Sequence, residues 1–202
     1  MTTLSDDEIH QIVQRVLAQA MGQGQARSAA PAALPVPQDA APAVSPEAKP
    51  AGAKIVVLGA DHGGVELKEI LKAELVELGY DVRDVGTYTK AAVDYPEFAH
   101  EVAKRVAGGK AWRGIMIDGA GIGSCIVANK VPGVRAGMAY DLSSAINSRE
   151  HNDTNVLTLG AGLIGANLAK QIVKAWLGTE FGGGRHAKRV DLITAVEKQY
   201  LK

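Results

Sequence analysis

Residues 113 to 130 read Arg-Gly-Ile-Met-Ile-Asp-Gly-Ala-Gly-Ile-Gly-Ser-Cys-Ile-Val-Ala-Asn-Lys, and this stretch decides the fold class. An apolar strand over residues 114–117 leads into a glycine loop and then into a helix from about Ser124. With no side chains at Gly119, Gly121 and Gly123, backbone N–H groups can converge on an anion, and the helix start adds positive potential. Asp118 stands at the mouth of this loop. Its charge would repel a bound phosphate, so we expect it to face a reacting carbon.

Strand and helix patterns alternate on both sides of this stretch. The predicted strands are 55–58, 81–85, 114–117, 134–139 and 156–159. Helices are predicted from about residue 65 to Gly79, from Asp94-Tyr95-Pro96 to Ala107, from Ser124, over 142–150, over 166–177 and from about His186. Five nearly continuous apolar strands separated by helices predict an α/β fold with a parallel sheet covered on both faces. Ligands of such sheets bind beyond the carboxyl ends of the strands.

The N-terminal residues 1–21 predict an amphipathic helix. Ser5 and Glu8 form a capping box, and one helical face is apolar while the opposite face is polar. The apolar residues are Ile9, Ile12, Val13, Val16, Leu17 and Ala20. A helix of this length is marginal alone in water, so the apolar face requires a partner. That partner is either a coiled-coil or core element, or another protein to which the helix docks.

Residues 22–53 predict a linker. They hold six of the eight prolines of the chain among many alanines. This composition favours extended segments and offers little to a core, so the helix is tethered at a distance from residues 54–202. A short amphipathic helix joined by an Ala/Pro-rich linker resembles the encapsulation peptides of bacterial microcompartment cargo enzymes. That resemblance implies a microcompartment shell protein as the partner of residues 1–21.

Composition excludes several classes of protein. Lys+Arg and Asp+Glu both number 22, which gives no support for binding to nucleic acid or to an anionic membrane. Cys125 is the only cysteine, so no disulfide framework and no CxxC metal motif exist. No apolar run reaches the roughly 18 residues of a spanning helix. Asp6, Asp7 and Glu8 stand where a targeting signal would be basic, and we expect a cytoplasmic protein.

Four polar groups follow predicted strands: Asp61-His62, Asp118, Asp141 and, a little later, His151-Asn152. A basic cluster of Arg185, His186, Lys188 and Arg189 could neutralise a phosphate. Each group also has a structural interpretation. The aspartates 61 and 141 could cap helices, His151 could be a surface histidine, the basic cluster a solvated helix face, and the glycines a tight turn. Their shared location after strand ends favours a site.

Several motifs in chain order resemble the ribose-5-phosphate isomerase B family of sugar-phosphate isomerases. They are Gly-Ala-Asp-His-Gly-Gly (59–64), Asp-Tyr-Pro (94–96), Gly-Ala-Gly-Ile-Gly (119–123), Ala-Asn-Lys-Val-Pro-Gly-Val-Arg-Ala (128–136), Arg-Glu-His-Asn-Asp-Thr-Asn-Val-Leu (149–157) and Gly-Gly-Arg-His-Ala-Lys-Arg-Val (183–190). The resemblance implies a Rossmann-like α/β/α sandwich with a five-stranded parallel sheet over residues 54–202. It also implies aldose–ketose isomerisation without metal or cofactor, in a homodimer or tetramer whose subunits share active sites.

The resemblance implies a role for each motif residue. Asp61 and His151 open the sugar ring, and Asn152 holds substrate oxygens. The loop of Gly119, Ala120, Gly121 and Gly123 stabilises the enediolate through its N–H groups, while Arg185, Arg189 and His62 bind phosphate. Moving a proton between two sugar carbons needs a base near the carbon and donors aimed at the growing oxyanion, which agrees with this assignment.

Three positions depart from the family pattern. Asp118 replaces a cysteine base, Ala120 replaces a threonine or serine, and Gly162 replaces an arginine that reaches phosphate from the neighbouring subunit. An aspartate is a weaker base than a cysteine, with free pKa values of about 3.9 and 8.5. Cys125 is a less favoured candidate base. The departures indicate a different sugar phosphate or weak activity.

Three hypotheses about function follow. The main one is isomerisation of a phosphorylated sugar, ribose 5-phosphate first, to its ketose with Asp118 as base. The second is a non-catalytic or altered-specificity isomerase-like cargo protein of a microcompartment. The third is a dinucleotide-binding oxidoreductase, because Gly119-x-Gly121, a helix, a strand and Asp141 loosely match that motif, although the third glycine is one position early.

Overall fold

The computed structural model describes Asp7, Gln11, Arg15 and residues 54–201. Asp7, Gln11 and Arg15 are helical and exposed, and they belong to the polar face predicted for the N-terminal helix. The apolar face of that helix and the linker prediction for residues 22–53 lie outside the described residues. None of the helices in the part of the chain that the structure describes is long and apolar enough to cross a membrane.

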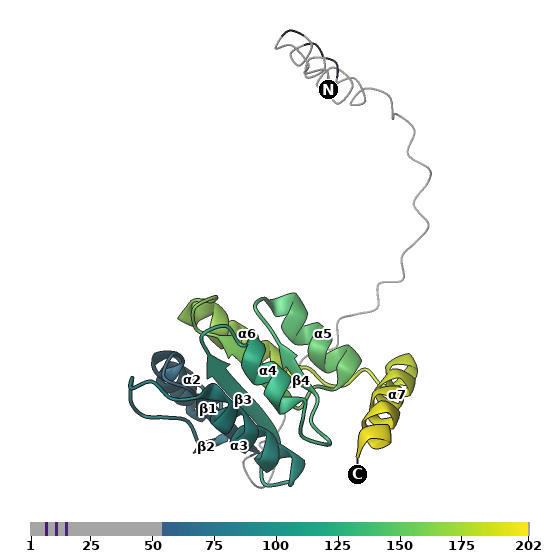
Figure 1. The fold of residues 1–202 in the computed structure, drawn as a ribbon, viewed down its shortest axis with the longest axis horizontal. Helices are drawn as coiled ribbons and strands as arrows, with labels where there is room; N and C mark the ends of the chain where they lie inside the picture. The colour runs from purple at the N-terminus through teal and green to yellow at the C-terminus, as the bar shows by residue number, and fades with distance from the viewer. Residues whose placement is uncertain (1–6, 8–10, 12–14, 16–53, 202) are drawn as a thin grey trace, which may run out of the picture. The chain divides into compact units, whose positions relative to one another are not determined.

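A five-stranded, all-parallel sheet forms the centre of residues 54–201, in the order β2-β1-β3-β5-β4 (Figure 1). The strands are β1 (Ile55–Ala60), β2 (Asp81–Asp84), β3 (Arg113–Asp118), β4 (Ala136–Met138) and β5 (Val156–Gly160). The helices are α2 (Val65–Glu77), α3 (Tyr95–Ala107), α4 (Ile122–Ala128), α5 (Leu142–Asn152), α6 (Ala166–Gly178) and α7 (Gly184–Tyr200). The predicted α/β fold with five parallel strands is confirmed.

Alternate residues of each central strand enter two separate cores. On one face, Leu58 and Ile115 pack with Leu71 of α2 and with α5 and α6 around the fully buried Trp176. On the other face, Met116 packs with residues of α3 and α4. Successive strand side chains point to opposite faces, so a strand covered on both faces must be apolar throughout. This requirement explains the nearly continuous apolar strand sequences.

The strand order places a topological switch point between β1 and β3. From β1 the chain first moves outward to β2 and then returns to pair β3 on the other side of β1. The chain after β1 leads to α2 on one face of the sheet and the chain after β3 leads to α4 on the other, which is where such sheets are expected to form a ligand crevice. Ala60 is in register with Ile117, so Asp61 and Asp118 both follow directly at this crevice.

Two helix boundaries differ from the prediction. α4 begins at Ile122, two residues earlier than expected, because the Asp118 side chain accepts hydrogen bonds from the loop and from the first turn of α4. α5 continues to Asn152, so His151 and Asn152 belong to its last turn. The helix ends at Asp153, which has a left-handed φ of 46°. His151 and Asn152 are therefore held on a helix and not in a loop.

Candidate active site

Asp118 lies at the carboxyl end of β3, is only 4% exposed, and folds back onto its own loop. Its Oδ1 accepts hydrogen bonds from the N–H of Ala120 at 2.8 Å and from the N–H of Gly121. Its Oδ2 accepts from the N–H of Ser124 at 3.2 Å and from the Ser124 hydroxyl. The loop N–H groups that we expected to hold a substrate oxyanion are thus bound to Asp118.

Gly121 makes this loop possible. Its φ is 78°, in the left-handed region, and a Cβ there would lie 2.9 Å from the carbonyl carbon of Leu159. Only glycine fits both the dihedral angle and the close approach to β5. Gly123 has a different role, because a Cβ there would collide with the ring of Tyr95, which packs over the loop from the start of α3.

Asp61 stands beside Asp118 across the switch point. Its Oδ1 accepts hydrogen bonds from the N–H groups of Gly63 and Gly64, at 3.0 and 3.1 Å. These bonds close the turn in front of α2, whose N-cap is Gly64 and has no side-chain cap, so the interpretation of Asp61 as a helix cap is wrong. Burial raises the pKa of the Asp61 carboxyl and the nearby Asp118 adds to the rise, while the Gly64 N–H opposes it. The site therefore holds two neighbouring buried carboxyl groups, those of Asp61 and Asp118.

His62 is exposed and is tied to the segment that follows β2. Its Nδ1 lies 3.1 Å from the carbonyl oxygen and 3.2 Å from the nitrogen of Val93. The start of that segment is bound by Lys68, a fully buried lysine of α2. Its Nζ contacts both carboxylate oxygens of Asp84 and the carbonyl of Thr87. The buried ion pair thus fixes the segment against which His62 rests.

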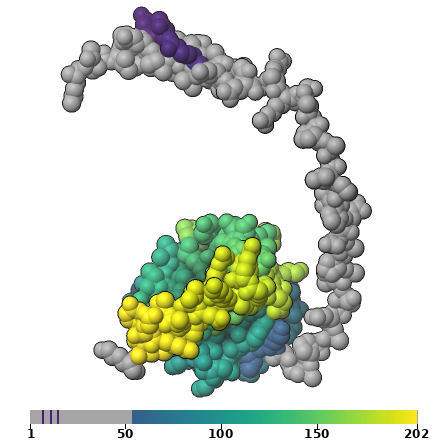
Figure 2. Space-filling view, turned by 90° about the vertical axis from the view of Figure 1, so that its right-hand side faces the viewer, coloured from purple at the N-terminus to yellow at the C-terminus, as the bar shows by residue number. Residues whose placement is uncertain are grey.

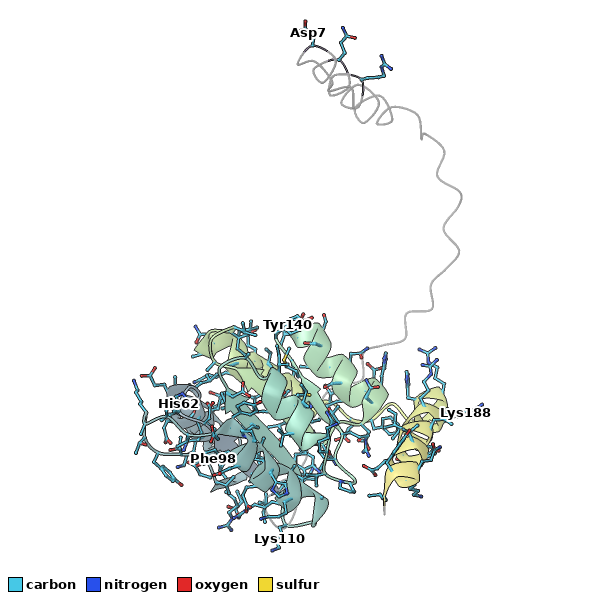
Figure 3. The ribbon with its side chains drawn as sticks, viewed as in Figure 1. Asp7, His62, Phe98, Lys110, Tyr140 and Lys188 are labelled. Carbon is cyan, nitrogen blue, oxygen red and sulfur yellow. The ribbon has the colours of Figure 1, made fainter. Side chains whose placement is uncertain are left out.

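His151, Asn152 and the basic cluster lie at the opposite edge of the sheet. α5 starts beyond the carboxyl end of β4 and returns to the start of β5, so its last turn is at the amino edge. Gly182 donates to the Glu150 carbonyl at 2.9 Å, which brings the beginning of α7 to the same edge. Figure 3 shows His62 on one side of the domain and Lys188 of α7 on the other. The expectation that all these groups share one location within a chain is therefore wrong.

These residues form a compact group of their own. The rings of His151 and His186 stack with centroids 4.1 Å apart and an interplanar angle of 11°. Arg185 Nε lies 3.3 Å from His186 Nε2, and His151 Nδ1 lies 2.8 Å from the Asn147 amide. Burial, His151 and the neighbouring arginines, in that order, lower the pKa of His186. Arg185 and Arg189 are exposed, so the group presents positive charge to solvent.

Two further predictions can be placed. Asp141 caps α5: its Oδ1 accepts from the Ser144 N–H at 2.6 Å, and this bond lowers its pKa. The oxidoreductase hypothesis needs β3 and β4 to be neighbours, because a dinucleotide-binding unit pairs its first two strands. In the sheet, β5 lies between β3 and β4, so these strands do not form such a unit. Cys125 points toward β4, with Sγ 3.5 Å from the Ala136 carbonyl, and burial raises its pKa.

Sequence reasoning missed Ser124 and Lys68 as parts of the site. Ser124 was interpreted only as the beginning of a helix, although it is a fully buried hydroxyl against a buried carboxylate. Lys68 stands on the apolar face of α2, flanked by Leu67 and Leu71, and is fully buried itself. A lysine at a core position was the available signal, because such a residue is almost never fully buried without a partner.

The fold and these motifs define a member of the Ribose/Galactose Isomerase family: the model of that family matches residues 56–193, and the chain belongs to it. The chain is 49% identical over 146 residues to Ribose-5-phosphate isomerase B of Escherichia coli (strain K12), covering 72% of this chain and 98% of that protein. It is 41% identical to D-erythrulose-4-phosphate isomerase of Pectobacterium atrosepticum, covering 71% and 95%.

Solved structures agree with the relatives. The structure of Clostridium thermocellum Ribose-5-Phosphate Isomerase B is 48% identical in sequence and superposes with a TM-score of 0.72. It covers 73% of this chain and 99% of that chain. The family resemblance inferred from the motifs is confirmed.

Proposed function

We propose that residues 54–202 catalyse the aldose–ketose isomerisation of a phosphorylated sugar, with ribose 5-phosphate and ribulose 5-phosphate as the first pair to test. The observation that carries this proposal is the buried Asp118 beside Asp61 at the switch point, on a loop of N–H donors. The Escherichia coli relative, at 49% identity, supports the choice of substrate. The Pectobacterium atrosepticum relative makes a four-carbon sugar phosphate the second candidate.

In the proposed reaction, the Asp118 carboxylate takes the proton from C2 of the open-chain aldose. The C–H electron pair forms the C1–C2 double bond, and the C1 carbonyl oxygen becomes the enediolate oxyanion. Proton transfer between the two oxygens and return of the proton from Asp118 to C1 give the ketose, so no external oxidant or reductant is needed. N–H groups of the glycine loop would stabilise this oxyanion.

The remaining roles are assigned by the family resemblance. Asp61 and His151 open the sugar ring, and Asn152 holds substrate oxygens. Arg185, Arg189 and His62 bind the phosphate. No step is assigned to a metal or cofactor. The arginines suit this role because their planar forks match phosphate oxygens and because both are exposed at the start of α7.

A homodimer, or a tetramer, whose subunits share active sites would complete the site. Asp118 lies at the carboxyl edge of the sheet and His151 at the amino edge of the same chain. A site that contains both groups therefore takes Asp118 from one subunit and His151 from another. α7 supports such pairing: Leu192, Ile193 and Val196 are 59%, 48% and 55% exposed and share one helical face. Figure 2 shows the surface of α7, in yellow, spread along one side of the domain.

For the extension, residues 1–21 would dock the enzyme to a microcompartment shell protein, and residues 22–53 would be the tether. The exposed helical residues Asp7, Gln11 and Arg15 are consistent with a polar face turned to solvent. This proposal places the protein in the cytoplasm, inside a microcompartment where such shells form.

A non-catalytic cargo protein is the second candidate function. The four hydrogen bonds to Asp118 favour it, because a carboxylate bound to its own loop is held away from any substrate. Gly162 supports it too, since the position lacks the phosphate-binding arginine of the family pattern. Tight binding of a sugar phosphate without turnover would be its signature.

A substrate panel separates these candidates. The full chain would be assayed with ribose 5-phosphate, erythrulose 4-phosphate and galactose 6-phosphate, and isomerisation followed by NMR. Turnover of at least one sugar phosphate supports the proposal. Binding without turnover of any of them supports the cargo protein, and a parallel titration with nicotinamide dinucleotides is expected to show no binding.

A further inference from the structure

Ser124 makes two contacts with one oxygen of Asp118. It is fully buried in the first turn of α4, and its N–H and its hydroxyl both donate to Oδ2. The other oxygen, Oδ1, accepts from Ala120 and Gly121. All four donors come from the loop of Asp118 and from α4, and three of them are backbone N–H groups. The Ser124 hydroxyl is the one side-chain donor of the four.

Proton uptake by Asp118 requires one of these donors to leave. An ionised carboxylate offers about four lone-pair positions, and four donors use them. The N–H groups of Ala120 and Gly121 are fixed by the left-handed Gly121, and that of Ser124 by α4. The hydroxyl can rotate about its own bonds. In a helix, a serine hydroxyl can also donate to the carbonyl three residues earlier, which here is that of Gly121, the N-cap of α4.

We propose that Ser124 is the positioning residue for Asp118. Its hydroxyl holds Oδ2 while the carboxylate is charged, and it rotates away when Asp118 takes the proton from the substrate carbon. The inference rests on the proposed function, in which Asp118 is the base. It adds the residue that sets the orientation and the proton affinity of that base.

Three other polar side chains lie near the Asp118 loop and could affect its carboxylate. Asp61 lies beside it in the loop after β1, because Ala60 and Ile117 are in register on paired strands. His62 follows Asp61 and is held at Val93. Tyr95 packs against Gly123 from α3. Of these neighbours and Ser124, only Ser124 donates a side-chain hydrogen bond to Asp118.

A purely structural cap would behave differently from a positioning residue. Losing a cap lowers the melting temperature but leaves the pH dependence of turnover unchanged. Losing a donor to the charged form lets the carboxylate take up a proton at higher pH. One charge-assisted hydrogen bond corresponds to an upward movement of the acid limb of the kcat/KM profile by about one pH unit.

The test uses Ser124→Ala, with Ser144→Ala as the matched control. Ser144 occupies the same kind of position, in the first turn of a helix beside a capping aspartate, and this helix follows β4, which β5 separates from β3. We expect Ser124→Ala to move the acid limb upward by about one unit and to lower kcat about tenfold. Ser144→Ala should leave the limb in place. Ser124→Thr, which keeps the hydroxyl, should return the limb toward the wild-type position.

The acid limb of Ser124→Ala decides the inference. A limb at the wild-type pH, with Asp118→Asn inactive, would overturn the role of Ser124 and leave the base assignment intact. Full activity of Asp118→Asn would remove the base and the inference together. Equal movement of the limb in Ser124→Ala and Ser144→Ala would also refute the inference, because the effect would not be specific to Asp118.

Discussion

Mixing two inactive variants should restore activity if two subunits share each active site. Asp118→Asn disables the group at the carboxyl edge of the sheet, and His151→Ala disables the group at the amino edge. In a heterodimer of these variants, one site combines both intact groups and the other combines both altered groups. Each heterodimer therefore has one working site of two.

The size of the recovery follows from the geometry. Purified heterodimers should show about half of the wild-type kcat, and a randomly exchanged equal mixture, in which about half of the dimers are hetero, should show about a quarter. The chains would carry two different affinity tags, be co-expressed and be purified through both tags. Turnover of the best sugar phosphate from the panel gives the readout.

The control is a pair of variants from the same edge, Asp118→Asn with Asp61→Asn. These groups lie together across the switch point, so their heterodimers contain one altered group in every site. They should stay inactive or nearly so. If the Asp118→Asn and His151→Ala heterodimer fails to recover activity, Asp118 of one subunit and His151 of another do not share an active site.

Two further predictions concern the buried ion pair and the N-terminal extension. Lys68→Met leaves Asp84 with Lys72 at 3.0 Å and should lower the free energy of unfolding by about 3 kcal/mol in urea titrations, whereas Lys90→Met on the exposed Glu66 pair should have little effect. Burial opposes ionisation of Asp84, but its hydrogen bonds from Lys68 and Lys72 outweigh this and hold its pKa below the ordinary 3.8. The ion pair therefore stabilises the wild type above pH 3.8, and this stabilisation is lost as the pH falls below that value. An equally steep loss of stability at acid pH in Lys68→Met would contradict the assignment. Deleting residues 1–21 should leave turnover intact and abolish co-purification with microcompartment shells, and unchanged shell association would remove the docking role.

The sequence was sufficient for the fold because every element depends on local patterns. The apolar strands and the glycine stops appear in the structure within a few residues of the predicted bounds. The start of α4 was predicted too late because the turn is set by the Asp118 side chain, a contact that periodicity does not contain. The end of α5 was predicted too early because the residue that ends it in a left-handed conformation is Asp153 and not a glycine, so the sequence has no clear stop signal there.

The site was harder to predict than the fold. Residues 61 and 118 follow paired strands, so their proximity could be inferred from strand order, but His151 and Arg185 were assigned to the same place without knowing which edge α5 returns to. The direction of the Asp118 carboxylate was also beyond the sequence. Its choice between a substrate carbon and the loop N–H groups depends on the three-dimensional position of Ser124.

Exchange of solvent hydrogen into the sugar reports the removal of a carbon-bound proton, which is the step assigned to Asp118. In deuterium oxide, the wild type should place deuterium at the carbon next to the carbonyl during turnover. Asp118→Asn should lose both exchange and isomerisation by at least about 100-fold. Asp141→Asn, which alters the aspartate that caps α5, should retain both. Exchange and isomerisation at the wild-type rate in Asp118→Asn would show that Asp118 is not the base.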